Sequence, residues 1–388
     1  MQLLYSKLVD PSEYDMDGIS SPEINVRISR FADFEEIGTI RAQEDWRKYV
    51  GPVEPYYRGG LGPKYNFMAI AVPECLPERL EIISYANEFA FLYDDMVDNV
   101  SKEEGDKLND QLMAAFQEAA TTGKITQALT GKRYVQAQML LEMMAIDKPR
   151  ALVAMKAWAE FAELASGREH FTDFASLDQY IPYRILDVGE MFWFGMLTFG
   201  MGLTIKEEEI EECRLLSRDA YIIFGLQNDL YSWDKEVAAA EKIGQKHVVN
   251  AVYVIMKEHG VGVDDAKQIC RRVILEHEAK YIKTLREVEK RTDLSHDLKR
   301  FVEALQYSST GNVLWSILCP RYHADVDFNE RQYYRMNHGA VSVPPNHDYG
   351  LKTIFEPPAP VAPAEPTAPA APATTPLASQ PVEVKASA

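Results

Sequence analysis

The chain has 388 residues, 46% of them hydrophobic, and a net charge of −18. This charge excludes a nucleic-acid backbone as an expected partner, because such binding draws on clustered Lys and Arg. The longest apolar stretch, residues 191–205, is shorter than the about 18 residues of a membrane span. The N-terminus lacks signal-peptide features, and four widely spaced cysteines predict buried free thiols, so we expect a reducing, cytoplasmic location.

The first quarter of the chain predicts an irregular arm followed by helices. Residues 1–32 are punctuated by Pro, Gly, Ser and Asp and are expected to be irregular, whereas residues 32–49 predict a helix. A loop over residues 51–65 leads to a short apolar segment. Its Phe67 is a candidate for a cavity wall, and an ordinary core position fits equally well.

The next predicted helix runs from Leu76 to Asp98 and ends in the carboxylates Asp94, Asp95 and Asp98. Because helical residues turn by about 100°, Asp94 and Asp98 share a face with Phe91. Carboxylates at a helix C-terminus face the negative end of the helix dipole and favour a neutralising cation. Mg²⁺ takes one or two carboxylates and completes its shell with water and phosphate. A magnesium-phosphate site is predicted; a helix that merely ends in acidic residues is the alternative.

From residue 102 the hydrophobic pattern is helical, with breaks near residues 121–123, 147–149, 166–167 and 200–202. No run alternates with period two for long enough to predict a strand. Further helices are expected over residues 247–259, 264–290 and 295–317. The sequence therefore predicts an all-α fold with one helical domain.

A helix starting near Leu177 carries Arg184, which shares its face with Val188 and Met191 by spacing. An arginine among apolar neighbours needs an anion. A bound anion is one candidate, and a salt bridge to an internal carboxylate is the alternative.

A second acidic helix carries Asn228, Ser232 and Glu236 at i, i+4 and i+8, which places three oxygen ligands on one face. Phe224, one turn earlier, continues that face as an aromatic. This spacing alone is a weak signal, but together with the Asp94 motif it is a strong one. Residues 237–245 are expected to form a loop able to close over a cavity.

At these residues the chain resembles the class I terpene cyclases, and more closely the cyclase domains of fungal bifunctional terpene synthases. Residues 73–79 and 86–91 carry the closer likeness. The resemblance implies a class I terpenoid synthase helical bundle around a central apolar cavity. It implies cyclisation of geranylgeranyl or geranylfarnesyl diphosphate to a polycyclic hydrocarbon, with three Mg²⁺ ions.

The resemblance also implies a role for each candidate residue. The metal ligands are Asp94, Asp95, Asp98, Asn228, Ser232 and Glu236; the diphosphate is bound by Arg184, Lys235, Arg321 and Tyr322; and Asp94, Arg184, Asn228, Ser232 and Glu236 are catalytic. In relatives a small residue that breaks the helix follows the arginine, and here Val188 and Gly189 both fit. The cavity wall is expected to include Phe67, Phe91, Val188, Phe192, Phe224 and Trp315, although a core position fits Trp315 equally well.

Two other functions are alternatives. A chain-elongating prenyltransferase resembles this fold but uses two D-D-x-x-D motifs, and Asp264-Asp265 lacks the third aspartate and fits helix capping. A non-catalytic helical protein that binds diphosphate is the other alternative. The sequence decides neither the product skeleton nor a C20 or C25 substrate.

The C-terminal segment differs in composition, since Pro and Ala supply 19 of the 33 residues from position 356 onward. Such a segment builds no core. We expect a cyclase domain over residues 1–342 and a disordered linker over residues 343–388. The resemblance implies a prenyltransferase domain downstream in a full-length protein, and a homo-oligomer stays open.

Overall fold

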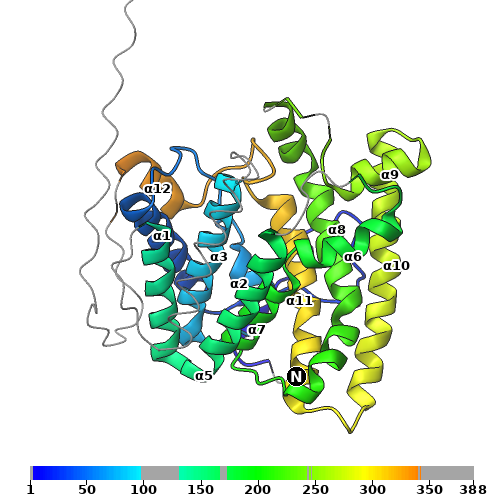
Figure 1. Ribbon diagram of the computed structural model, residues 1–388, viewed down its shortest axis with the longest axis horizontal. Coiled ribbons are helices and arrows are strands. Elements are labelled where there is room, and N and C mark those ends of the chain that lie inside the picture. The colour runs from blue at the N-terminus through cyan, green and yellow to red at the C-terminus, as the bar shows by residue number, and fades with distance from the viewer. Residues whose placement is uncertain are drawn as a thin grey trace, which may run out of the picture.

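The computed structural model describes residues 3–97, 131–166, 173–242, 244–245, 247–339 and 341. Within these ranges the chain is a bundle of helices that run side by side (Figure 1). This architecture confirms the all-α prediction. The described helices are α1 (Ala32–Tyr49), α2 (Phe67–Ala71), α3 (Pro77–Val97), α5 (Lys132–Ser166), α6 (Leu177–Asp187), α7 (Glu190–Gly200), α8 (Ile210–Lys242), α9 (Ala251–His259), α10 (Val263–Lys290), α11 (His296–Leu318) and α12 (Glu330–His338), with 3₁₀ turns at Pro11–Glu13 and Glu207–Glu209.

The N-terminal arm is more ordered than its composition predicts. Strands β1 (Ser6–Leu8) and β2 (Arg27–Ser29) pair antiparallel, with Ser6 opposite Ser29. The buried carboxylate of Glu74 accepts the backbone N–H groups of Leu4, Tyr5 and Ser6. Three-residue strands are too short for an alternating pattern, so the sequence offered no signal for them.

One helix ends later than predicted, and one further helix was not predicted. Helix α8 continues to Lys242, so residues 237–242 are helical rather than the expected loop; its three consecutive alanines, residues 238–240, are strong helix formers. Helix α12 was not predicted. The break expected near residue 147 is confirmed as a kink, because Asp147 has φ −154° and ψ 87° inside α5.

Helix α2 packs between α3 and α11 and places Phe67 inside the bundle (Figure 1). Its N-terminus is held by Glu35 of α1, whose carboxylate accepts the N–H groups of Met68 at 2.7 Å and Ala69 at 2.5 Å. On the other side, a Cβ on Gly311 of α11 would lie 2.4 Å from the Ile70 carbonyl oxygen. Glycine is therefore required there for α11 to approach α2 this closely.

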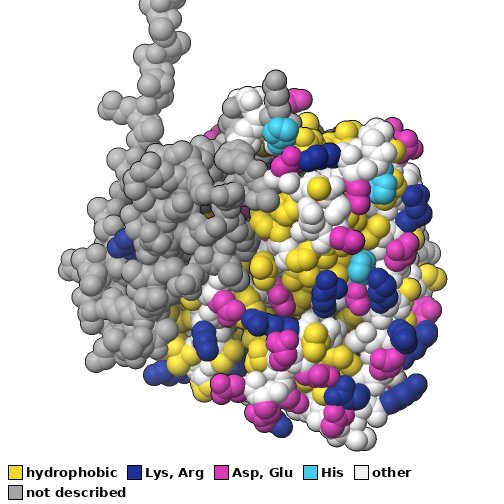
Figure 2. Space-filling model, turned by 45° about the vertical axis from the view of Figure 1, so that its right-hand side comes forward, with side chains coloured by type: hydrophobic (Ala, Val, Ile, Leu, Met, Phe, Trp, Pro, Cys, Tyr) yellow, Lys and Arg dark blue, Asp and Glu magenta, His cyan; other side chains and the backbone are white. Residues whose placement is uncertain are grey.

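Outside the site, a buried arginine links three helices of the bundle. Arg41 joins α1, α3 and α5 through ion pairs to Glu81 and Glu142 inside the bundle. On the face drawn in Figure 2, acidic and basic side chains are interspersed among hydrophobic ones. The four cysteines are free and buried, as predicted. None of the described helices has the length and apolar character needed to cross a membrane.

The C-terminal ends of α3, α8 and α11 lie at the same end of the bundle, the upper end in Figure 1. Side-chain contacts join them there: Asp95 of α3 contacts Lys235 of α8 and Arg321, which follows α11. Segments far apart in the sequence thus bring the predicted site residues together.

Candidate active site

Asp94 and Asp95 close α3 in different surroundings. Asp95 accepts hydrogen bonds from Lys235 Nζ at 3.0 Å and from the two terminal nitrogens of Arg321 at 3.1 and 2.8 Å. Burial raises the pKa of Asp95, but the charges of Arg321 and Lys235 outweigh burial and lower that pKa overall, so the carboxylate is ionised. Asp94 is 62% exposed and lies 3.5 Å from Arg321. Asp98 lies outside the described residues.

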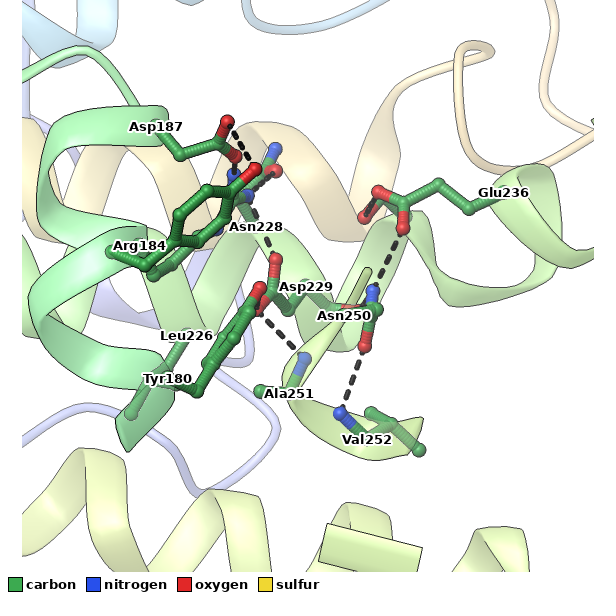
Figure 3. Close-up of polar contacts among 12 residues, drawn as sticks. Tyr180, Arg184, Asp187, Leu226, Asn228, Asp229, Glu236, Asn250, Ala251 and Val252 are labelled. Atoms are coloured by element: carbon green, nitrogen blue, oxygen red, sulfur yellow. Dashed lines mark hydrogen bonds and ion pairs between the residues drawn. The ribbon is translucent and has the colours of Figure 1, made fainter. Parts of the chain in front are cut away.

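The three oxygen donors of α8 share one helical face, as their spacing predicts. Ser232 Oγ donates to Glu236 Oε1 at 2.6 Å, and Glu236 Oε2 accepts from Asn250 Nδ2 at 3.0 Å (Figure 3). Asn228, one turn before Ser232, donates from its amide to the Tyr322 hydroxyl at 2.9 Å. These contacts fix the orientation of all three side chains.

Arg184 is nearly buried in α6, with 11% of its side chain exposed, and its guanidinium contacts two carboxylates (Figure 3). It forms ion pairs with Asp187 and, at 2.7 Å, with Asp229, and it donates to Asn228 Oδ1 at 2.6 Å. The anions that pair with Arg184 in this structure are therefore internal carboxylates. This agrees with the alternative prediction, a salt bridge inside the protein. Its contact with Asn228 nevertheless places the guanidinium beside the α8 donors.

Asp229 is a site residue that the sequence did not indicate. It is completely buried and accepts the Tyr180 hydroxyl at 2.7 Å and the Ala251 N–H at 3.0 Å (Figure 3). Burial raises the pKa of Asp229, against the opposing effect of the Arg184 charge. Asp229 thus ties α6 and the start of α9 to α8. Its position directly after Asn228 was the only available signal, because its burial depends on tertiary packing.

The junction of α6 and α7 separates the two residues that fit the helix break. Gly189 has φ +91°, a left-handed conformation that favours glycine, and the helix is interrupted there. Val188 instead faces α8: a Cβ built on Gly225 would lie 3.7 Å from Val188 Cβ and 3.1 Å from Arg184 Cγ. The helix break therefore lies at Gly189, whereas Val188 makes the contact with α8.

An aromatic cluster adjoins the polar groups and comprises Phe67, Phe91, Trp193, Phe224 and Trp315. The Phe67 ring lies 5.8 Å from Phe91, 5.8 Å from Trp193 and 4.8 Å from Trp315, and Trp193 lies 5.3 Å from Phe224. The Arg321 guanidinium sits 4.6 Å over the Phe91 ring. The cluster and the cationic groups are therefore in direct contact.

Trp193 takes the place in this cluster where Phe192 was expected. Phe192 packs instead against Trp158 of α5, with ring centroids 5.2 Å apart, and against Phe161 at 6.0 Å. Neighbouring residues on a helix point about 100° apart, so only one of the two can face the cluster. Helical spacing alone did not indicate which one.

The donor set fits Mg²⁺. Within the described ranges no group of three or more His, Cys, Asp or Glu side chains forms a cage for a metal. Mg²⁺ needs no such cage, since one or two carboxylates with substrate phosphate and water suffice. Glu236 Oε1 and Ser232 Oγ, 2.6 Å apart, supply a pair of hard oxygen donors, and Asp94 is open to solvent on the opposite helix.

Comparison with known proteins agrees with this geometry. A family model described as terpene synthase family 2, C-terminal metal binding, matches residues 85–280. Fusicoccadiene synthase of Phomopsis amygdali is 50% identical over 349 residues, which are 88% of this chain and 48% of that protein. A bifunctional type I diterpene synthase of Aspergillus flavipes is 48% identical (89% and 45%), and a bifunctional sesterterpene synthase of Aspergillus aculeatus is 45% identical (87% and 47%). The chain spans about half the length of the curated relatives it matches.

Solved structures show the same fold. Aristolochene synthase from Penicillium roqueforti superposes with a TM-score of 0.56 at 22% identity, covering 65% of this chain and 83% of that one. An α-eudesmol synthase gives 0.59 at 16% identity, covering 75% and 96%. The fold is that of the class I terpenoid synthases. From the match of the family model and the identity to these relatives, the chain belongs to terpene synthase family 2, the family with the C-terminal metal-binding domain.

Proposed function

We propose that this chain ionises a linear isoprenoid diphosphate with the help of Mg²⁺ and cyclises the resulting carbocation to a polycyclic hydrocarbon. The observation that carries the proposal is the position of Arg321, which binds Asp95 and also lies 4.6 Å over the Phe91 ring. A diphosphate bound by this guanidinium would have its hydrocarbon chain beside the aromatic cluster. The site thus has a polar end for the leaving group and an apolar end for the cation.

The metal-binding residues would be Asp94 on one helix and Asn228, Ser232 and Glu236 on the other, with Asp95 and Asp98 contributing charge or ligation. Three Mg²⁺ ions are expected with diphosphate present. When bound, Mg²⁺ would neutralise the charge that develops on the leaving diphosphate. Because the protein is strongly acidic, this neutralisation also allows an anionic substrate to approach.

The diphosphate would be held by Arg184, Lys235, Arg321 and Tyr322 through charge-assisted hydrogen bonds. Arg321 and Lys235 are now paired with Asp95, and Arg184 with Asp187 and Asp229. These carboxylates orient the three cationic side chains. The donors stabilise the leaving group as the C–O bond breaks, so ionisation needs no general base.

The aromatic cluster would then exclude water and stabilise cations through the faces of its rings. Phe67, Phe91, Phe224 and Trp315 would form the wall, as expected for them, and Trp193 would join them. Val188 would border this wall from the α6 side. Phe192 would support the wall from behind through Trp158 and Phe161.

The substrate class follows from the names of the relatives, which include diterpene and sesterterpene synthases. Geranylgeranyl diphosphate is favoured, because the diterpene synthase is 48% identical and the sesterterpene synthase 45%. Two of these relatives are called bifunctional, which supports a prenyltransferase domain beyond the predicted linker of residues 343–388 in a longer protein. A cyclase domain over residues 1–342, a cytoplasmic location and a homo-oligomer stay predictions.

The test is incubation with Mg²⁺ and geranylgeranyl or geranylfarnesyl diphosphate in parallel, with and without isopentenyl diphosphate. We expect a cyclic hydrocarbon by gas chromatography and mass spectrometry, chiefly from the C20 substrate. Longer diphosphates formed only with isopentenyl diphosphate would instead identify a chain-elongating enzyme. Diphosphate binding without any turnover would leave a binding protein. The variant Asp94→Asn serves as the metal-site control.

A further inference from the structure

The loop between α1 and α2 touches both ends of the site through its backbone. The carbonyl oxygen of Arg58 accepts a hydrogen bond from Arg321 Nη1 at 2.9 Å. Two residues later, the Gly60 carbonyl accepts the Trp315 indole N–H at 2.9 Å and the Phe67 N–H at 3.0 Å. One short segment, Arg58–Gly60, therefore orients the guanidinium at the polar end and the indole in the aromatic cluster.

This segment is anchored by Glu88, a completely buried residue of α3. Glu88 Oε2 accepts the Gly60 N–H at 2.9 Å, and Oε1 accepts Gln43 Nε2 at 2.7 Å. Gln43 also donates to Gln332 of α12 at 2.8 Å, so α1, α3 and α12 together hold the carboxylate in place. The fit is tight, because a Cβ on Gly59 would lie 2.0 Å from Glu88 Oε1.

A buried carboxyl in this place is costly. Burial raises the pKa of Glu88 to about 7, while the Gly60 N–H, the Gln43 amide and the charge of Arg321 act in the opposite direction. An apolar side chain would avoid this cost but could not accept the Gly60 N–H. What the carboxylate contributes is the position of the loop.

We propose that Glu88 is a positioning residue, which through the Arg58–Gly60 segment sets the placement of both Arg321 and Trp315. This inference rests on the proposed function. It adds that the same residue, Glu88, positions both the group that binds diphosphate and an aromatic ring that influences which product forms. Displacing the segment would move the guanidinium away from the leaving group and tilt the indole in the aromatic cluster. Small misplacements of such groups have large effects on reactivity.

The experiment compares two variants that disturb the contact from opposite sides. Glu88→Gln turns one acceptor oxygen into a donor, which then faces either the Gly60 N–H or Gln43 Nε2, each of them a donor itself. Gly59→Ala adds a methyl group where there is no room. Glu88→Asp keeps the charge but withdraws it by one methylene, and it decides the question should the other two fail to fold.

Two control variants change equivalent chemistry elsewhere. Glu74→Gln alters another buried carboxylate that accepts backbone N–H groups, at the N-terminal strand. Gly51→Ala adds a methyl group in the same loop, where no atom lies within 4 Å. Both controls should keep the parent's product ratio and its affinity for inorganic diphosphate with Mg²⁺. Glu74→Gln should lower the thermal midpoint.

For Glu88→Gln and Gly59→Ala we expect affinity for inorganic diphosphate with Mg²⁺, measured by calorimetry, to fall by about threefold to tenfold, the loss of one or two hydrogen bonds. The hydrocarbon product ratio should change in the same variants. Amide hydrogen exchange, read by mass spectrometry, should accelerate in peptides covering residues 58–68. In Glu74→Gln it should accelerate at residues 4–6 instead.

The outcomes separate this inference from the proposed function. If the parent makes no hydrocarbon, the proposed function fails, while the exchange pattern still decides whether Glu88 holds the loop. If the Glu88 and Gly59 variants lose only thermal stability, and keep the parent's product ratio, diphosphate affinity and exchange at residues 58–68, Glu88 is a structural residue and the inference is overturned.

Discussion

The amide of Asn228 and the hydroxyl of Tyr322 are joined by a hydrogen bond of 2.9 Å across 94 residues of sequence. The other side of the same amide accepts from Arg184 at 2.6 Å. Asn228 is thus held between two groups that we propose bind diphosphate. The bond links α8 to the segment after α11. We therefore expect that removing the Tyr322 hydroxyl alters the orientation of the Asn228 amide.

Tyr322→Phe removes this hydrogen bond and should keep the ring in its edge contact with Trp315, where the centroids are 5.5 Å apart. We expect kcat/KM to fall by about threefold to tenfold, the loss of one hydrogen bond at the site. The product ratio should stay close to that of the parent, because the ring is retained. Steady-state kinetics with product analysis checks both statements; a changed ratio with unchanged kcat/KM would contradict them.

Asp94→Ala and Ser232→Ala should each lower turnover on the order of a hundredfold or more, because metal ligation contributes several kcal/mol to transition-state stabilisation. Circular dichroism should show an intact fold. The matched control is Asp234→Ala in the same turn of α8 as Ser232; the Asp234 side chain is 81% exposed and forms an ion pair with Lys267. This control should keep full turnover. Equal losses in all three variants would argue against a specific metal site.

The pH dependence of stability should reveal Glu35. Burial raises the pKa of Glu35 to about 8, against the lowering effect of the Met68 and Ala69 N–H groups; its ordinary value is 4.5. Between about pH 5 and pH 8 the folded chain binds a proton that the unfolded chain has released, so this carboxyl stabilises less as pH rises. Glu35→Gln does not titrate and satisfies only one of the two N–H groups.

The variant should therefore be less stable than the parent at pH 5, and this difference in thermal midpoint should shrink towards pH 8. Melting curves followed by circular dichroism at several pH values measure it. The control variant Glu13→Gln makes the same substitution at an exposed carboxyl. A constant difference across the range would mean that Glu35 does not titrate in this window.

The sequence predicted what depends on local helical geometry. The bounds of α1 follow from the hydrophobic periodicity of its sequence. The shared face of Asn228, Ser232 and Glu236 follows from their spacing, because residues i and i+4 lie on the same side of a helix. The contacts of Arg184 with two carboxylates were weighed as an alternative, since an arginine among apolar neighbours requires an anion.

The sequence did not predict the groups whose positions depend on tertiary packing. In the sequence, Asp229 is an acidic residue beside the candidate ligand Asn228 and has no distinguishing feature. Its burial results from contacts with α6 and the start of α9. The Arg58–Gly60 carbonyls carry no side-chain signal at all, and Glu88 lies in an apolar helix where a carboxyl suggests a surface position. These contacts join segments that only the folded chain brings together.

Trp193 and Phe192 of α7 contact different sets of aromatic rings, Trp193 the ring of Phe67 and Phe192 the ring of Trp158. Phe91 and Phe224 lie in the aromatic cluster, whereas Phe192 packs on Trp158 and Phe161. Replacing Phe91 or Phe224 by Leu removes a π face worth about 1 to 2 kcal/mol to a desolvated cation, enough to change a branch point by roughly tenfold. Ionisation depends mainly on the polar end of the site, so total turnover should stay within about an order of magnitude of the parent, with the larger loss in Phe91→Leu, whose ring lies under the Arg321 guanidinium.

Phe192→Leu is the matched control, because it makes the same substitution in α7 outside the cluster. It should lower thermal stability and leave the ratio of products nearly as in the parent. Trp193→Leu should instead act like the Phe91 and Phe224 variants, with more early-terminated or less cyclised hydrocarbons by gas chromatography. If Phe192→Leu redirects the products and Trp193→Leu does not, the carbocation lies on the α5 side of α7, and the cluster around Phe67 is ordinary core.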